Sequence, residues 1–177
     1  MIVLGCDFTS APSPTKPLTL ARCRLDGATL TLERIERYQD FTSFEALLDA
    51  PGPWVAGFDF PFGQARRFLE QAGWPLRWAD YVRHAEALGA RGFAGALEAY
   101  KAERPTGDKH HRRACDVRTG AQSPQTLYGT PVAKMWFQGA VRLLRAGVHV
   151  PLLRATGDDR VALEVYPGVG ARTLAGT

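Results

Sequence analysis

The sequence is poor in cysteine and has no long uninterrupted apolar run. Its three cysteines, Cys6, Cys23 and Cys115, lie far apart and form no C-x-x-C pair. This spacing argues against a disulfide framework and against a structural zinc site. No apolar stretch approaches the ~18–20 residues that cross a bilayer. We therefore expect no membrane association and a reducing, cytoplasmic setting.

The composition is that of an ordinary globular protein. The chain has 177 residues, of which 45% are hydrophobic and 23% are charged. This length and balance predict a single domain over residues 1–177 with a real hydrophobic core. The formal net charge of +4 favours an anionic partner, either nucleic acid or another phosphate-containing substrate.

Apolar, β-prone runs predict the sheet. They indicate five strands, at residues 2–9, 18–25, 30–35, 54–60 and 161–166. Asp26-Gly27 is a strong hairpin signal, so the first three strands are expected to form an antiparallel meander. The later strands alternate with helical patterns, which is typical of an α/β fold with a mixed sheet and helices on its faces.

Helical patterns have recognisable ends. Thr42 and Glu45 read as the T-x-x-E capping box of a short helix, and a later helical pattern stops at Gly89. Thr130 and Pro131 are expected to begin a helix that ends at Gly147. Residues 105–129 show no apolar period and are predicted to form a long loop, which is often a functional feature.

A short internal repeat is the most informative motif. Gly5-Cys6-Asp7-Phe8 and Gly57-Phe58-Asp59-Phe60 each place G-x-D-F at the end of an apolar strand. Side chains alternate along a strand, so each glycine shares a face with its aspartate and leaves room for a ligand or a neighbouring backbone. A carboxylate on a buried strand is costly unless it is paired or bound to a cation.

A divalent cation would relieve the cost of both aspartates together. Mg²⁺ and Mn²⁺ prefer oxygen ligands, and Glu164 offers a third acid on an apolar strand. We therefore predict that Asp7, Asp59 and Glu164 are catalytic residues and metal ligands at one sheet edge. The ordinary alternative is that each acid caps a turn or forms a salt bridge.

Four motifs in order resemble a known family. They are Gly5 to Ser10, Gly57 to Gly63, Lys109 to Asp116 and Glu164 to Gly168. Together they resemble domain-of-unknown-function family 429, which is described as predicted nucleases with a ribonuclease H-like fold. The resemblance implies a three-stranded meander followed by two strands parallel to the first. It also implies that Asp7 and Asp59 lie on adjacent strands and that they and Glu164 hold metal.

The sequence departs from the ribonuclease H-like pattern at its end. Such nucleases usually supply another acid from a C-terminal helix, whereas this chain stops just after the last predicted strand. We therefore expect either that the sequence is a fragment that lacks a C-terminal helical segment, or that the acidic site is incomplete.

A basic segment in the long loop is the candidate substrate contact. Lys109, Arg112 and Arg113 are expected to clamp phosphate, because arginine binds phosphate oxygens in a bidentate way. His110 or His111 is a candidate proton donor. The ordinary alternative is a solvated loop in which Asp116 pairs with a neighbouring arginine.

The leading functional hypothesis is a divalent-metal-dependent phosphodiesterase, most plausibly a nuclease acting on DNA or RNA. A second hypothesis is phosphoryl transfer. Asp7-Phe8-Thr9-Ser10 followed by Lys16 resembles the first phosphate loop of the sugar-kinase and actin-like branch of the fold. A third is a non-catalytic nucleic-acid-binding module.

Overall fold

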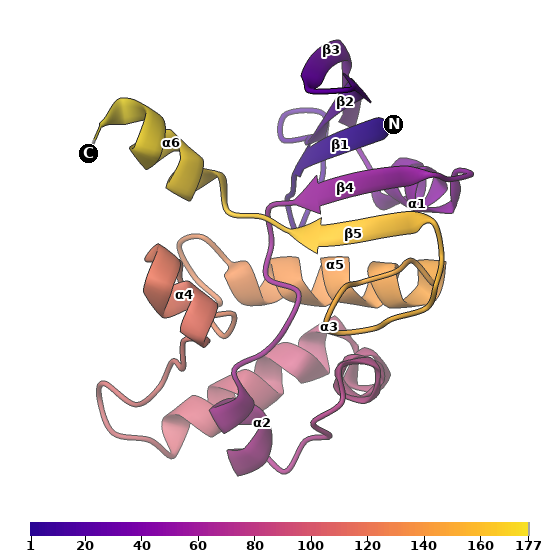
Figure 1. The fold of residues 1–177 in the computed structure, drawn as a ribbon. Coiled ribbons are helices and arrows are strands. Elements are labelled where there is room, and N and C mark those ends of the chain that lie inside the picture. Colours follow the sequence, from indigo (N-terminus) through magenta and orange to yellow (C-terminus); the bar gives the residue numbers. More distant parts are fainter. Residues whose placement is uncertain (177) are drawn as a thin grey trace. The chain divides into compact units, whose positions relative to one another are not determined.

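The computed structural model describes residues 1–176 and shows an α/β protein (Figure 1). Its strands are β1 (Ile2–Asp7), β2 (Leu18–Asp26), β3 (Thr29–Tyr38), β4 (Trp54–Phe58) and β5 (Arg160–Glu164). Its helices are α1 (Phe41–Asp49), α2 (Arg66–Gln71), α3 (Trp78–Ala102), α4 (Ala114–Thr119), α5 (Val132–Ala146) and α6 (Pro167–Ala175). No helix within residues 1–176 combines the length and the apolar character needed to cross a membrane.

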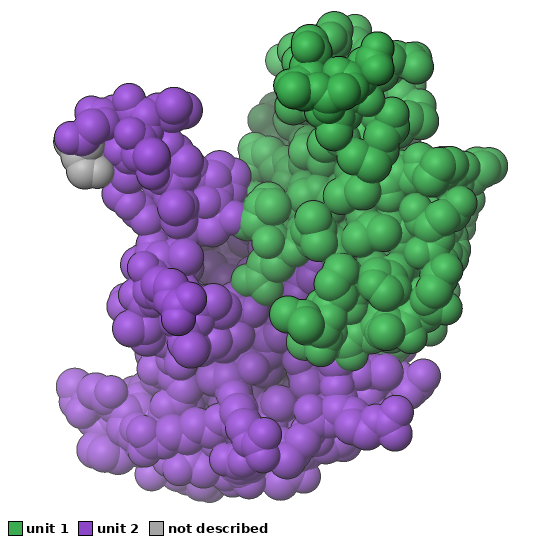
Figure 2. All heavy atoms as spheres, viewed as in Figure 1, with its two compact units in different colours: residues 1–59, 142–165 green, residues 60–141, 166–177 purple. Residues whose placement is uncertain are grey.

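The chain divides into two compact units (Figure 2). Unit 1 consists of residues 1–59 and 142–165, and unit 2 consists of residues 60–141 and 166–177. Helix α5 is divided between them at Val141 and Arg142. The expectation of a single domain treats these two units as one body and stays a prediction.

Unit 1 contains a five-stranded mixed sheet with the strand order β3-β2-β1-β4-β5. The pairs β1–β2 and β2–β3 are antiparallel, whereas β1–β4 and β4–β5 are parallel. The predicted meander and mixed sheet are therefore confirmed. The turn that joins β2 to β3 lies at Gly27, whose φ of 55° suits glycine, as the Asp-Gly signal predicts.

One face of this sheet packs against α1. Phe44 of α1 makes edge contacts with Phe8 and Phe58, at ring centroid distances of 5.4 and 5.8 Å, and Cys6 on the same face is buried. The helix begins one residue before Thr42, because the Asp40 side chain accepts a hydrogen bond from the Ser43 amide at 2.8 Å. The N-cap is therefore Asp40, and the expected capping box is wrong.

Unit 2 is helical around a tryptophan-rich core. Trp136 is fully buried, and its ring lies 5.0 Å from Phe93 and 6.0 Å from Tyr81. The indole N–H groups of Trp136 and Trp78 both donate to the Phe62 carbonyl, at 3.1 and 2.7 Å. The Phe60-to-Phe62 segment is thereby fixed in the core.

Two helix breaks fall where the glycines predict them. Helix α3 changes direction at Gly89, which has φ 69° and ψ 170°, a conformation that side-chain-bearing residues rarely adopt. Helix α5 ends before Gly147, which has φ 74°. The predicted long loop at 105–129 instead contains the short helix α4.

Candidate metal centre

Asp7 and Asp59 stand at corresponding positions on two adjacent parallel strands. The register pairs Gly5 with Gly57 and Cys6 with Phe58, and the Asp59 amide donates to the Cys6 carbonyl at 3.0 Å. The ladder therefore continues to the aspartates, and neighbouring strands lie about 4.8 Å apart. The structure brings these two predicted site residues together.

The two carboxylates share the face of the sheet that α1 does not cover. Cys6 and Phe58 are buried against α1, whereas Asp7 is exposed and Asp59 is half-buried. Because side chains alternate along each strand, both aspartates point to the opposite face from Cys6 and Phe58. Within unit 1, the carboxylates are therefore turned away from the packed core.

The pKa of Asp59 is raised in part because Asp7 lies close to it. Burial raises the pKa of Asp59, and the negative charge of Asp7 raises it further. Burial and the same two carboxylates raise the pKa of the Cys6 thiol to about 12. The thiol is therefore protonated at neutral pH and is a poor metal ligand, since thiolates rather than thiols bind metals.

Neither carboxylate has a compensating partner. Within residues 1–176, no ion pair and no side-chain hydrogen bond reaches the carboxylate of Asp7 or Asp59. The alternative in which each acid caps a turn or forms its own salt bridge does not describe this pair. Two adjacent, uncompensated carboxylates on an accessible face fit the oxygen-rich environment that Mg²⁺ or Mn²⁺ requires.

The glycines of the repeat have different roles. A Cβ atom on Gly57 would lie 2.9 Å from Cγ1 of Val165, so this glycine admits a neighbouring side chain. A Cβ atom on Gly5 would meet nothing within 4 Å. Gly5 therefore leaves open space beside Asp7, as a ligand site needs.

Glu164 lies in a different position from the aspartates. Its register partner on β4 is Phe58, which in turn pairs with Cys6. Register partners share a face, so the pleat assigns Glu164 to the face of Cys6 and Phe58. The structure brings two of the three predicted acids together and does not place Glu164 on their face.

The register also reveals two polar neighbours that the sequence did not. Thr19 is paired directly with Asp7, and Arg37 is paired directly with Thr19. Arg37, Thr19, Asp7 and Asp59 therefore form a row across four strands on one face. Arg37 is exposed, and its guanidinium is the positive charge of this row.

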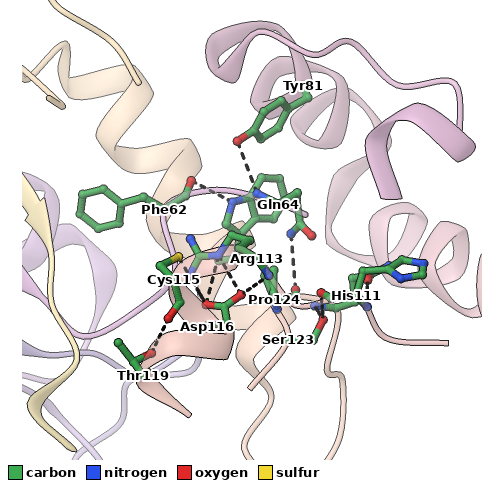
Figure 3. Close-up of polar contacts among 12 residues, drawn as sticks. Phe62, Gln64, Tyr81, His111, Arg113, Cys115, Asp116, Thr119, Ser123 and Pro124 are labelled. Atoms are coloured by element: carbon green, nitrogen blue, oxygen red, sulfur yellow. Dashed lines mark hydrogen bonds and ion pairs between the residues drawn. The ribbon is translucent and has the colours of Figure 1, made fainter. Parts of the chain in front are cut away.

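In unit 2, Arg113 is bound within its own helix terminus (Figure 3). Its guanidinium contacts both carboxylate oxygens of Asp116, at 2.6 and 3.0 Å, and its amide donates to the same carboxylate at 2.8 Å. Asp116 is only 2% exposed. The interpretation that Asp116 pairs with a neighbouring arginine is confirmed, and this pair caps α4. Arg112 is exposed and Lys109 is half-buried.

The two histidines belong to separate contacts in unit 2. His111 is buried, and its Nε2 lies 2.6 Å from the Tyr100 hydroxyl. Its amide donates to Gln125, and its carbonyl accepts from Ser123, both at 2.7 Å (Figure 3). Burial lowers the pKa of His111, and nearby Arg67 lowers it further. A neutral imidazole in this network anchors the basic loop.

His110 is the more accessible of the two. Its Nε2 lies 2.9 Å from the Tyr128 hydroxyl. Burial lowers its pKa, and the charge of Lys101 lowers it further. Both imidazoles are therefore biased toward the neutral form, which weakens either as the predicted proton donor.

No family model, curated protein or solved structure matches this chain. The resemblance to family 429 therefore stays a prediction.

Proposed function

We propose that this protein is a divalent-metal-dependent phosphodiesterase, most plausibly a nuclease, with Asp7 and Asp59 as its metal ligands. The observation that carries the proposal is the pair itself: two adjacent carboxylates on one open sheet face, with no cationic partner among the residues that the structure describes. Such a pair carries an uncompensated repulsion, and a divalent cation is the ligand that removes it. The strand order and directions also support the ribonuclease H-like topology that the resemblance implies.

The residues of unit 1 divide the chemical tasks between them. Asp7 and Asp59 would hold Mg²⁺ or Mn²⁺ at the end of β1 and β4. The bound ion supplies charge neutralisation at the phosphate and lowers the pKa of a coordinated water. Arg37, two strands from Asp7, would neutralise a phosphate oxygen, and Thr19 would donate a hydrogen bond between them. Glu164 has no ligand role in this proposal, because its register places it on the other face.

The distribution of charge supports an anionic substrate. Unit 2 contains 13 Lys and Arg residues against 7 Asp and Glu residues, which gives it a net charge of +6. Unit 1 contains 9 against 11, which gives it −2. A strongly basic unit favours nucleic acid over a small phosphorylated metabolite. We propose that the exposed Arg112 and the half-buried Lys109 contact its backbone, whereas Arg113 is structural.

Metal-dependent cleavage of short DNA and RNA strands tests the proposal. Single- and double-stranded substrates would be incubated with Mn²⁺, with Mg²⁺ and with EDTA. We expect cleavage only with metal, and its loss in Asp7→Asn and in Asp59→Asn. The matched control is Asp26→Asn, which removes the same charge at the other end of the sheet and preserves the Asn-Gly turn preference.

The other two hypotheses predict different results. Thermal stabilisation by Mg-ATP without strand cleavage would favour phosphoryl transfer. Salt-sensitive nucleic-acid binding without turnover, unaffected by Asp7→Asn, would favour a non-catalytic module. Cleavage that persists in both aspartate variants would remove Asp7 and Asp59 from the mechanism.

A further inference from the structure

Strand β3 forms one edge of the unit 1 sheet. It spans the ten residues Thr29–Tyr38 and pairs only with β2. Within the described part of the chain, no other main-chain hydrogen bond reaches it. An edge strand of this length without proline exposes a row of amide and carbonyl groups, which is a template for pairing with another strand.

The side chains of β3 are unusual for a free edge. Leu30, Leu32 and Ile35 are 56%, 56% and 52% exposed. Between and beyond them lie four charged residues in the order Glu33, Arg34, Glu36 and Arg37. Charges on an edge strand ordinarily prevent pairing with other chains, so the order of their signs decides whether they do so here.

The order of charges along β3 is complementary to the order along an antiparallel β3 of a second copy. If β3 pairs antiparallel with β3 of a second copy about Ile35, then Arg34 lies opposite Glu36 of that copy. Glu33 is the bulged residue of β3 and contacts Arg24, on the other face from Arg37, so it takes no part in this pairing. Arg34 and Glu36 therefore each meet the opposite charge of the second copy, which stabilises cross-strand pairs.

Neighbouring registers do not share this property. A shift of one residue turns the side chains of the second copy to the other face of the sheet, so that Arg34 no longer meets Glu36. A shift of two residues places Arg34 opposite Arg34, or Glu36 opposite Glu36. Like charges directly opposite are destabilising, so the charge order selects one register of self-pairing and opposes its neighbours.

We propose that this protein forms a two-fold symmetric dimer through β3, with Ile35 on the axis and the two sheets joined into one. A second copy is the partner because the charge pattern complements itself. Arg34 and Glu36 carry the interface. They already lie on the same side of the strand, 2.8 Å apart, whereas Glu33 is paired with Arg24 of β2 at 2.7 Å. Two-fold pairing of this kind is an isologous contact.

Charge exchange tests the proposal, with the mass in solution as the readout. Light scattering after size-exclusion chromatography should give the wild-type chain twice its 19.4 kDa. Arg34→Glu and Glu36→Arg should each give a monomer, because each places like charges opposite in the symmetric pair. An equimolar mixture of the two variants should restore the doubled mass, because each copy then meets the opposite charges on the other.

Two further variants serve as controls for the mass measurement. Arg24→Glu breaks the Arg24–Glu33 pair on the neighbouring strand and should leave the dimer intact. The double variant Arg34→Glu/Glu36→Arg restores opposite charges within one chain and should dimerise by itself, even if either single variant folds poorly. A monomeric wild-type protein at every concentration up to its solubility limit would overturn the proposal. So would folded single variants, checked by circular dichroism, that stay monomeric when mixed.

Discussion

Replacing Asp59 by asparagine should stabilise the metal-free protein at neutral pH. The substitution keeps the shape of the side chain and removes one of two like charges on strands about 4.8 Å apart. Coulomb's law gives about 0.8 kcal/mol for unit charges at ~5 Å in water and about 3 kcal/mol at an effective dielectric constant of ~20. Asp7 is exposed and Asp59 only half-buried, so screening by solvent favours the lower end, about 1 kcal/mol.

The pH dependence of this gain follows from the direction of the pKa shift. The pKa of Asp59 is raised above its ordinary value of 3.8 by burial and by Asp7, so the folded state holds its proton more tightly than the unfolded state does. Below a pH of 3.8 the carboxyl is protonated in both states, and the pair does not lower the free energy of unfolding. As the pH rises through the raised pKa of Asp59, the folded protein loses stability. The advantage of Asp59→Asn should be complete at pH 7 and vanish in acid.

Metal should reverse the sign of the effect. A ligand present at 100 times its dissociation constant stabilises the folded state by about 2.7 kcal/mol. At such a concentration Mn²⁺ should stabilise the wild-type protein by this amount, and it should stabilise Asp59→Asn much less. For a protein of this length, 1 kcal/mol corresponds to roughly 2–4 °C in Tm. The variant should therefore melt a few degrees higher in EDTA and lower in excess Mn²⁺.

Thermal melts in EDTA and in a Mn²⁺ titration measure both effects, with Asp26→Asn as the matched control. The control removes one carboxylate from the same sheet, far from the pair, and should change neither the EDTA melt nor the response to Mn²⁺. The reasoning is refuted if Asp59→Asn lowers Tm in EDTA at pH 7. It is equally refuted by a Mn²⁺ response that is the same in all three proteins.

Three further substitutions test separate parts of the structure. Arg37→Ala should raise the KM for a nucleic-acid substrate with a smaller effect on kcat, whereas Arg24→Ala, on the other face of the hairpin, should change neither. Asp116→Ala should destabilise the protein by about 3 kcal/mol in urea unfolding, because it leaves a largely buried arginine unpaired. Loss of the exposed ion pair in Glu70→Ala should cost at most about 0.5 kcal/mol. Gly57→Ala should cost about 1–3 kcal/mol through overpacking, and an unchanged urea midpoint would contradict the close contact.

Local sequence patterns predicted the sheet well because most of its strands carry a local signal. Alternating apolar residues and the Asp26-Gly27 turn located the meander, and the structure confirms it. The third strand was predicted to end near Ile35, but β3 continues to Tyr38. Its second half is charged because it lies at the sheet edge, where Arg34 and Arg37 are exposed and Glu36 and Tyr38 are half-buried. A strand without apolar alternation gives no period-2 signal.

The features that the sequence did not predict have a common cause in pairing between distant segments. The face of Glu164 depends on its register against Phe58, and a one-residue change of register would transfer it to the other face. Thr19 and Arg37 become neighbours of Asp7 only through two further strand pairings. Helix α4 depends on the Arg113–Asp116 pair rather than on an apolar period. No local stretch of sequence predicts these features, because each depends on contacts that form only in the folded chain.

The contrast between Asp59 and the other acids of unit 1 separates a structural from a functional explanation. Asp158 forms an ion pair with Arg160 at 2.6 Å, and hydrogen bonds from that arginine lower the pKa of Asp158 to about 2. A carboxylate that stabilises a fold behaves in this way, because the charged form is the favoured one. Asp59 behaves in the opposite way, since its charged form is disfavoured by burial and by Asp7. The pair therefore weakens the fold at neutral pH, and a cation bound between the two carboxylates would turn that cost into a gain.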